Sequence, residues 1–290
     1  MNRRRSLLAS LSRSVVIALA IVGSGCHRAT PAERSAEPIA EKNAAARGGL
    51  QAWRAVKSMS LTGSLEAGKP FSQAKLAESY RRPRTQSKAV TRMALANPHQ
   101  ADANKPVLLP FVMEMERPRK SRVEVRFQGQ TAVQVFDGTM GWKLRPFLGR
   151  HEVEPYTAEE MQLASQQTDL DGPLMDHERK GNRVELEGNE PVAGHDAYRL
   201  KVTLSNGQVR HVWVDAQTFL EVKIDGGTRR LDGKQHPVWT YFSDYKAVNG
   251  LMIPHLLETA VEGVPGSEKI MVERVALNPQ LDDARFGKPN

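Results

Sequence analysis

Apolar and polar residues alternate along much of the chain, with the period of two that a β-strand shows when one face is buried. The clearest alternating runs are 111–116, 123–127, 183–187 and 198–204. Turn-forming pairs such as Asp137-Gly138 and Asn249-Gly250 separate them at the spacing of hairpins. The pattern therefore predicts roughly ten to thirteen antiparallel strands between Met59 and Leu277.

Two stretches have helical spacing instead. Residues 36–57 are rich in Ala, Glu, Lys and Arg, and Leu50 and Trp53 lie three apart, as on one helical face. This helix is either continuous or interrupted at Gly48-Gly49. A second helix starts at Thr157, which forms a capping box with Glu160, and ends before Asp169.

A long sheet with one apolar face must cover that face, and two helices rarely fill the concave side of ten or more strands. The sequence therefore predicts a mainly β fold for residues 36–290: one strongly curved antiparallel sheet, with helices as a lid and an apolar cavity beneath them. Residues 68–106 have the weakest periodicity and are expected to be an insertion in this domain.

The first 25 residues are predicted to be an export signal. Arginines at 3–5 and 13 precede the apolar run 14–22 and the small residues 23–25, and Cys26 follows at once. The apolar run is too short to span a bilayer as a mature helix. Cys26 is the only cysteine, which excludes an intrachain disulfide and a thiolate zinc site.

Two interpretations of this leader stay open. In the first, Cys26 carries a lipid anchor and residues 26–35 form a tether between the membrane and the domain. In the second, cleavage near Gly25 releases a soluble periplasmic protein.

The net charge of +8 is partly due to the leader, which carries four arginines and no acidic residue, so the mature chain has +4. A nucleic-acid partner is therefore not expected. Residues 69–105 hold eight Lys and Arg against two acidic residues. This basic segment is either a solvated loop or edge strand, or a surface that docks anionic lipid or an envelope protein.

The chain lacks the motifs of a serine-hydrolase elbow, a zinc-protease helix, a Walker loop and a dinucleotide-binding turn. The pair His195-Asp196 falls in a turn, where Asp is favoured by local hydrogen bonding. Asp169, Asp171 and Asp176 do not have calcium-loop spacing and are expected in a turn that ends the helix. We expect no enzyme activity, no catalytic residue, no metal and no cofactor.

Several short stretches carry a resemblance to a known family. They are Gly48-Gly-Leu-Gln-Ala-Trp53, Phe136-Asp-Gly-Thr-Met-Gly-Trp142, Asp169-Leu-Asp-Gly-Pro-Leu174, Gly194-His-Asp-Ala-Tyr-Arg-Leu200, Trp213-Val-Asp-Ala-Gln-Thr218, Gly250-Leu-Met-Ile-Pro254 and Phe286-Gly-Lys-Pro289. In this order they resemble the LolA/LolB-like superfamily, and within it the outer-membrane lipoprotein-sorting proteins, over residues 48–289. The segment 68–106 departs from that pattern in length and charge.

The resemblance implies a half-barrel that binds acyl chains or lipidated proteins in an apolar concavity, and it supplies no catalytic residue. With a lipidated Cys26 the protein would face the periplasm from the outer membrane, since His27 replaces the Asp of an inner-membrane retention signal.

Six apolar residues are candidates for the ligand-binding pocket. They are Phe111, Met113, Met115, Val125, Phe127 and Trp142. Each could equally be an ordinary core residue. An interaction lipoprotein that docks a partner through residues 69–105 is the alternative function, and an envelope hydrolase has the least support.

Overall fold

The computed structural model describes residues 31–67 and 107–289, apart from residues 168, 232 and 265. The export signal, Cys26 and the basic segment 69–105 lie outside the described residues, so the predictions for them stay predictions. Among the described residues, no helix is both long enough and apolar enough to cross a membrane.

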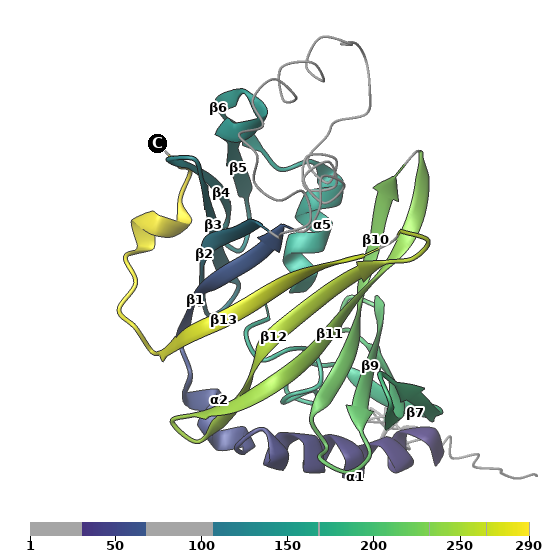
Figure 1. The fold of residues 1–290 in the computed structure, drawn as a ribbon. Coiled ribbons are helices and arrows are strands. Elements are labelled where there is room, and N and C mark those ends of the chain that lie inside the picture. Colours follow the sequence, from purple (N-terminus) through teal and green to yellow (C-terminus); the bar gives the residue numbers. More distant parts are fainter. Residues whose placement is uncertain (1–30, 68–106, 168, 232, 265, 290) are drawn as a thin grey trace, which may run out of the picture.

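Within the described residues, thirteen strands form one antiparallel sheet that curves into an open half-barrel (Figure 1). The strands are β1 (Ser58–Ala67), β2 (Val107–Glu116), β3 (Lys120–Phe127), β4 (Gln130–Phe136), β5 (Gly141–Arg145), β6 (Arg150–Pro155), β7 (Arg183–Val192), β8 (His195–Thr203), β9 (Val209–Asp215), β10 (Glu221–Leu231), β11 (Lys234–Val248), β12 (Leu251–Val261) and β13 (Ser267–Leu277). The predicted mainly β fold with a single curved sheet is confirmed.

The strand order is two meanders that meet in the middle. It runs β6-β5-β4-β3-β2-β1-β13-β12-β11-β10-β9-β8-β7, so the first and last strands are neighbours. The two edges, β6 and β7, are consecutive along the chain and do not pair with each other. The sheet is therefore a trough, and its edge strands flank the opening.

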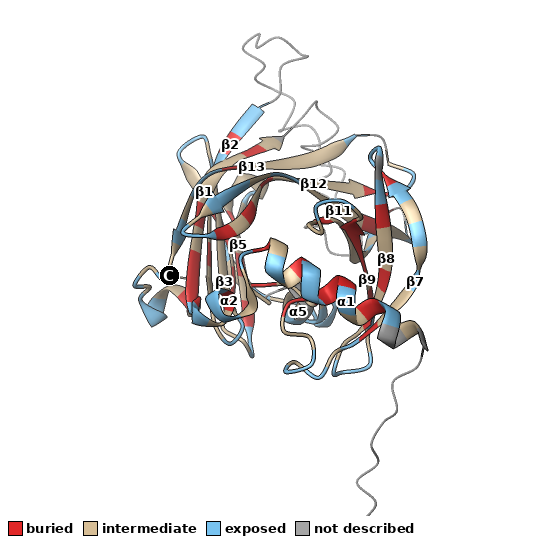
Figure 2. Ribbon diagram, turned by 90° about the horizontal axis from the view of Figure 1, so that it is seen from below, coloured by how far each residue is buried: buried red, intermediate tan, exposed pale blue. Residues whose placement is uncertain are grey.

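The helices lie in the trough and along its lower end (Figures 1 and 2). They are α1 (Pro31–Ala46), α2 (Leu50–Ala55) and α5 (Ala158–Gln167), and two short 3₁₀ turns span Pro146–Leu148 and Asp283–Phe286. Helix α1 begins five residues before the start expected from the sequence, at Pro31, a residue that suits the first helical position. Residues 31–35 are therefore helical, where a tether was expected.

The chain breaks between α1 and α2 at the two glycines. Gly48 and Gly49 have φ angles of 106° and 94°, which residues with a side chain rarely adopt. A Cβ on Gly48 would lie 2.3 Å from the carbonyl oxygen of Gly250. The glycines thus let the helix turn directly beneath the β11–β12 hairpin.

The predicted capping box of α5 is present. The Thr157 backbone N–H donates to Glu160 Oε2 at 2.7 Å, and the Glu160 N–H donates to Thr157 Oγ1 at 3.2 Å. The reciprocal bonds satisfy two of the free N–H groups at the start of the helix.

The inner face of the sheet is the one that packs against α1 and α2. Ala36, Ile39 and Ala40 of α1 lie against β7, β8 and β9, where Leu200 and Val212 are fully buried. Trp53 of α2 is 2% exposed and packs on β1, β2, β12 and β13. These two clusters fill the lower part of the trough.

Candidate functional site

A row of apolar side chains crosses the inner face above those clusters. Strand register places Phe242 beside Leu257, Leu257 beside Ile270, Ile270 beside Leu65, and Leu65 beside Leu109. Phe127 of β3 packs against the Leu65–Leu109 end. We call these six residues the inner row. Leu65 and Leu109 are buried, and the other four are only half-buried.

Helix α5 lies within the curve of the sheet (Figure 2), yet none of its described side chains is buried. Met161 and Leu163 are half-buried, whereas Ala36 of α1 is 0% exposed. The ion pair between Glu160 and Lys143 of β5 attaches α5 to the sheet. Helix α5 therefore covers the trough without sealing its apolar surface.

Five of the six residues predicted to bind ligand lie together on the inner face. Phe111 and Val125 are directly opposite each other, and Met113 and Met115 follow on the same face of β2. Phe111 is 4% exposed and belongs to the Trp53 cluster, while Met113, Met115 and Val125 are half-buried at its margin. Phe127 continues this face into the inner row.

Trp142 is not brought together with the other five. The register joins Glu114 to Arg122, Arg122 to Val135 and Val135 to Trp142 with no bulge, so these residues share the outer face. Met113, one position before Glu114, faces inward. The alternation correctly predicted a strand around Trp142, but Trp142 cannot line the inner face with Phe111.

Of the inner row, sequence reasoning named only Phe127. It missed Leu65 and Leu109 and the three residues that come from β11, β12 and β13. Phe242, Leu257 and Ile270 each have another apolar or aromatic residue close by in the sequence. Leu256 directly precedes Leu257, and Met271 directly follows Ile270. The period of two is blurred in these strands, because their outer face is also partly apolar. The spacing of Leu251, Ile253, His255 and Leu257 was the available signal.

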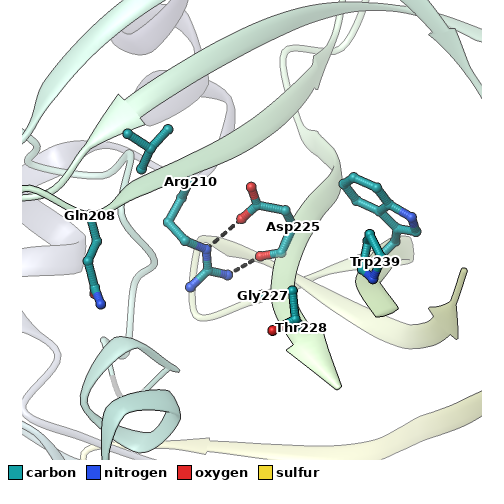
Figure 3. A pocket seen from close by; sticks show the side chains of 8 residues that line it. Gln208, Arg210, Asp225, Gly227, Thr228 and Trp239 are labelled. Carbon is teal, nitrogen blue, oxygen red and sulfur yellow. Dashed lines mark hydrogen bonds and ion pairs between the residues drawn. The ribbon is translucent and has the colours of Figure 1, made fainter. Parts of the chain in front are cut away.

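A notch lies where β9 and β10 separate (Figure 3). These strands pair only over residues 212–214 and 221–224. Beyond the paired region, Arg210, Asp225, Gly227 and Trp239 are among the residues that line a pocket of about 360 Å³. Pockets of this size accept small ligands or part of a larger one.

Solved structures with the same architecture exist at low sequence identity. A LolA superfamily protein from Nitrosomonas europaea aligns with a TM-score of 0.52 at 15% identity, covering 87% of this chain and 97% of that one. A DUF1329 family protein from Desulfovibrio piger also aligns at 0.52, with 12% identity and coverage of 89% and 98%.

The chain has a LolA-like fold. This confirms the architecture that the sequence resemblance implied. No protein-family model and no curated protein matches the sequence.

An acidic loop between α5 and β7 closes the lower end of the LolA-like trough. Asp171, with a side chain 3% exposed, binds Arg117 Nη2 and Lys180 Nζ at 2.6 Å each. Asp176 forms a two-point pair with Arg54 at 2.6 and 2.8 Å. Leu174 and Met175 of this loop enter the two core clusters. The carboxylates at 171 and 176, which a calcium loop would use as ligands, are thus already paired with basic side chains.

Asp169 and Asp171 have opposite pKa shifts although both contact Lys180. Burial raises the pKa of Asp169 to about 6, and the neighbouring Asp171 adds to this rise while Lys180 opposes it. Burial also acts to raise the pKa of Asp171, but Lys180, Asp169 and Arg117 together hold that pKa below its ordinary value. One carboxylate of the pair therefore carries the stable negative charge.

One group of described residues could hold a metal ion. The ligand atoms of Glu37, His177 and Glu178 lie within 4.8 Å of one another, and Glu37 Oε2 is 3.3 Å from His177 Nε2. Two carboxylates and an imidazole are ligands that zinc accepts. The expectation of no metal, drawn from the lack of metal-binding motifs in the sequence, stays a prediction.

Proposed function

We propose that this protein binds acyl chains of lipids or of lipidated proteins on the inner face of the trough, without catalysing a reaction. The observation that carries the proposal is the inner row, whose apolar side chains line the trough while four of the six stay only half-buried. Apolar surface of this kind on an inner face is typical of a ligand-binding groove.

The dimensions of the inner row suit an acyl chain. It crosses six adjacent strands, which at about 4.8 Å between strands gives a length of about 24 Å. A lipid chain in one leaflet spans about half of a 30 Å hydrocarbon core, or about 15 Å. Burial contributes about 0.8 kcal/mol per methylene, so a long acyl chain gains on the order of 10 kcal/mol before ordering costs.

The LolA-like fold supports this proposal as an analogy of architecture. The sequence adds the cellular setting: an export signal ending at Cys26 would place a lipid-anchored protein in the cell envelope. We infer that it faces the periplasm from the outer membrane, and that α5 is the cover that moves when a chain enters.

Adjacent leucines on β12 allow a matched test. Leu257 lies in the inner row, whereas Leu256 faces outward opposite Met271, and both are half-buried. In Leu257→Gln the affinity for a fluorescent fatty-acyl probe should fall about tenfold, because a polar amide replaces one apolar contact worth about 1.5 kcal/mol. In Leu256→Gln the affinity should stay at the wild-type value.

Equal losses in the two variants, or a wild-type protein that takes up no probe, would overturn the proposal. Solvent extraction of protein purified from its native membrane, followed by mass spectrometry, gives an independent check. Co-purified lipid or acylated peptide is expected. A preparation without either would favour an anchored interaction lipoprotein instead.

A further inference from the structure

The notch between β9 and β10 lies in the wall of the trough. Arg210 is opposite Val202 in the register and so shares the inner face, whereas Trp239 packs with Trp213 on the outer face. Side chains from both faces line the same pocket because the two strands separate there (Figure 3). A group bound in the notch is therefore reachable from the inner side of the sheet.

Arg210 is held in a fixed position with donors to spare. Its side chain is 8% exposed, its Nε donates to Asp225 Oδ1 at 2.6 Å, and its Nη2 donates to the backbone oxygen of Asp225. Neither contact uses Nη1. A guanidinium group fixed at two nitrogens can present the third to an oxygen atom without losing side-chain entropy.

The negative charge of Asp225 is already compensated. Besides Arg210, the backbone N–H of His211 donates to Asp225 Oδ2 at 2.8 Å, and His211 Nδ1 lies 3.0 Å from the same oxygen. The carboxylate therefore positions Arg210 and is not left free for a ligand cation. The groups that remain for a ligand in the notch include the Arg210 Nη1 amino group and the Gln208 amide.

A glycine bulge opens the notch further. Asp225 pairs with Trp239 and Thr228 with Pro237, so Gly226 and Gly227 together face the single residue Val238. Gly227 has φ +81°, and a Cβ there would lie 3.4 Å from Leu163 of α5. Two glycines in a strand mark a place where another group approaches the backbone closely.

We propose that the notch binds the phosphate or carboxylate headgroup of the lipid whose chain lies on the inner row. This deepens the proposed function and rests on it. Trp239, which lines the notch, and Phe242 of the inner row are three residues apart on β11, or about 10 Å along the strand. Arg210 donates to the headgroup oxygens, and Trp239 and Gly227 leave the space for them.

The test uses the exposed rim of the notch, so that folding is retained. Thr228 is exposed, and Thr228→Glu adds a negative charge that Thr228→Gln of similar size does not. Calorimetric titration compares dodecyl phosphate with dodecyl maltoside, which has the same chain and an uncharged headgroup, both below the micelle-forming concentration. Inorganic phosphate is the third ligand, and it is also tested as a competitor.

The wild type and Thr228→Gln should prefer dodecyl phosphate by about tenfold, the ratio that one hydrogen bond to a charged group contributes. Thr228→Glu should lose that preference while keeping its affinity for dodecyl maltoside. Competition by inorganic phosphate would show that the oxyanion alone suffices, and its absence would show that the site requires a lipid.

Two results would overturn the inference. One is equal binding of the two dodecyl ligands by the wild type, which leaves acyl binding intact and removes the headgroup site. The other is an unchanged preference in Thr228→Glu. If neither dodecyl ligand binds, the proposed function itself fails, and inorganic phosphate alone would then report on the notch.

Discussion

Asp169 and Asp171 carry opposite pKa shifts because of the partners around them. Both contact Lys180, but Asp171 also forms an ion pair with Arg117, so the ionised form is favoured at Asp171. Asp169 is left as a partly buried carboxyl group beside another carboxylate. At neutral pH the folded protein must ionise this group against the effect of burial, which makes it a source of pH-dependent stability.

Asp169→Asn should flatten that dependence. The folded state raises the pKa of Asp169 from 3.8 to about 6, so its contribution to stability is complete below pH 3.8 and is lost as the pH rises through about 6. Relative to the wild type, the variant should gain on the order of 1 kcal/mol in unfolding free energy between about pH 4 and about pH 7. Urea unfolding at the two pH values measures this gain.

Asp244→Asn is the control, since that side chain is 53% exposed. Its difference from the wild type should change less between the two pH values than that of Asp169→Asn. A change for Asp169→Asn that is no larger than that of the control would contradict the raised pKa of Asp169.

Single residues also show where sequence reasoning stops. Alternation around 198–204 predicted both the strand and its buried face, because polar Arg199 and Lys201 mark the outside. At Leu256-Leu257 and Ile270-Met271 both neighbours are apolar, so the pair by itself does not show which side chain faces inside. For Leu257 only the longer spacing from Leu251 and Ile253 indicates it. Trp142 was assigned to the wrong group for a related reason: the facing direction depends on register with strands far away in the chain.

At the scale of elements, an ion pair joins α5 to the sheet. Lys143 has a side chain 5% exposed, and Glu160 is its partner while also closing the capping box. The capping box itself was readable from Thr157 and Glu160 in the sequence. The partner on β5 was not, because nothing local in the sequence indicates which strand the helix will meet.

Glu160→Gln should isolate the ion pair, since glutamine also serves in a capping box. The variant leaves the Lys143 ammonium group buried without its counter-charge, and the unfolding free energy should fall by about 2 kcal/mol. Glu159→Gln, at an exposed position next to it, should change it by less than about 0.5 kcal/mol. Similar urea midpoints for the two variants would mean that α5 is held by other contacts.

At the scale of the whole molecule, the prediction concerns how the domain is attached. If Cys26 carries a diacylglyceryl group, two chains should hold the protein on a membrane. Cys26→Ser should therefore move the full chain from the membrane fraction to the soluble fraction when it is expressed in a bacterial host. Fractionation with immunoblotting measures the shift, and a variant that stays with the membrane would exclude the anchor.

The seam between β1 and β13 has a consequence for how the molecule is made. The hairpins from β2 to β6 and from β7 to β13 can form from local segments, but the seam joins the first described strand to the last one. Pairings between such remote segments form slowly, because the intervening chain must lose conformational entropy before the strands can make contact. A chain exported through a translocation channel from its N-terminus would therefore form the two halves of the sheet separately. The sheet would become continuous only after β13 had also crossed the membrane and paired with β1.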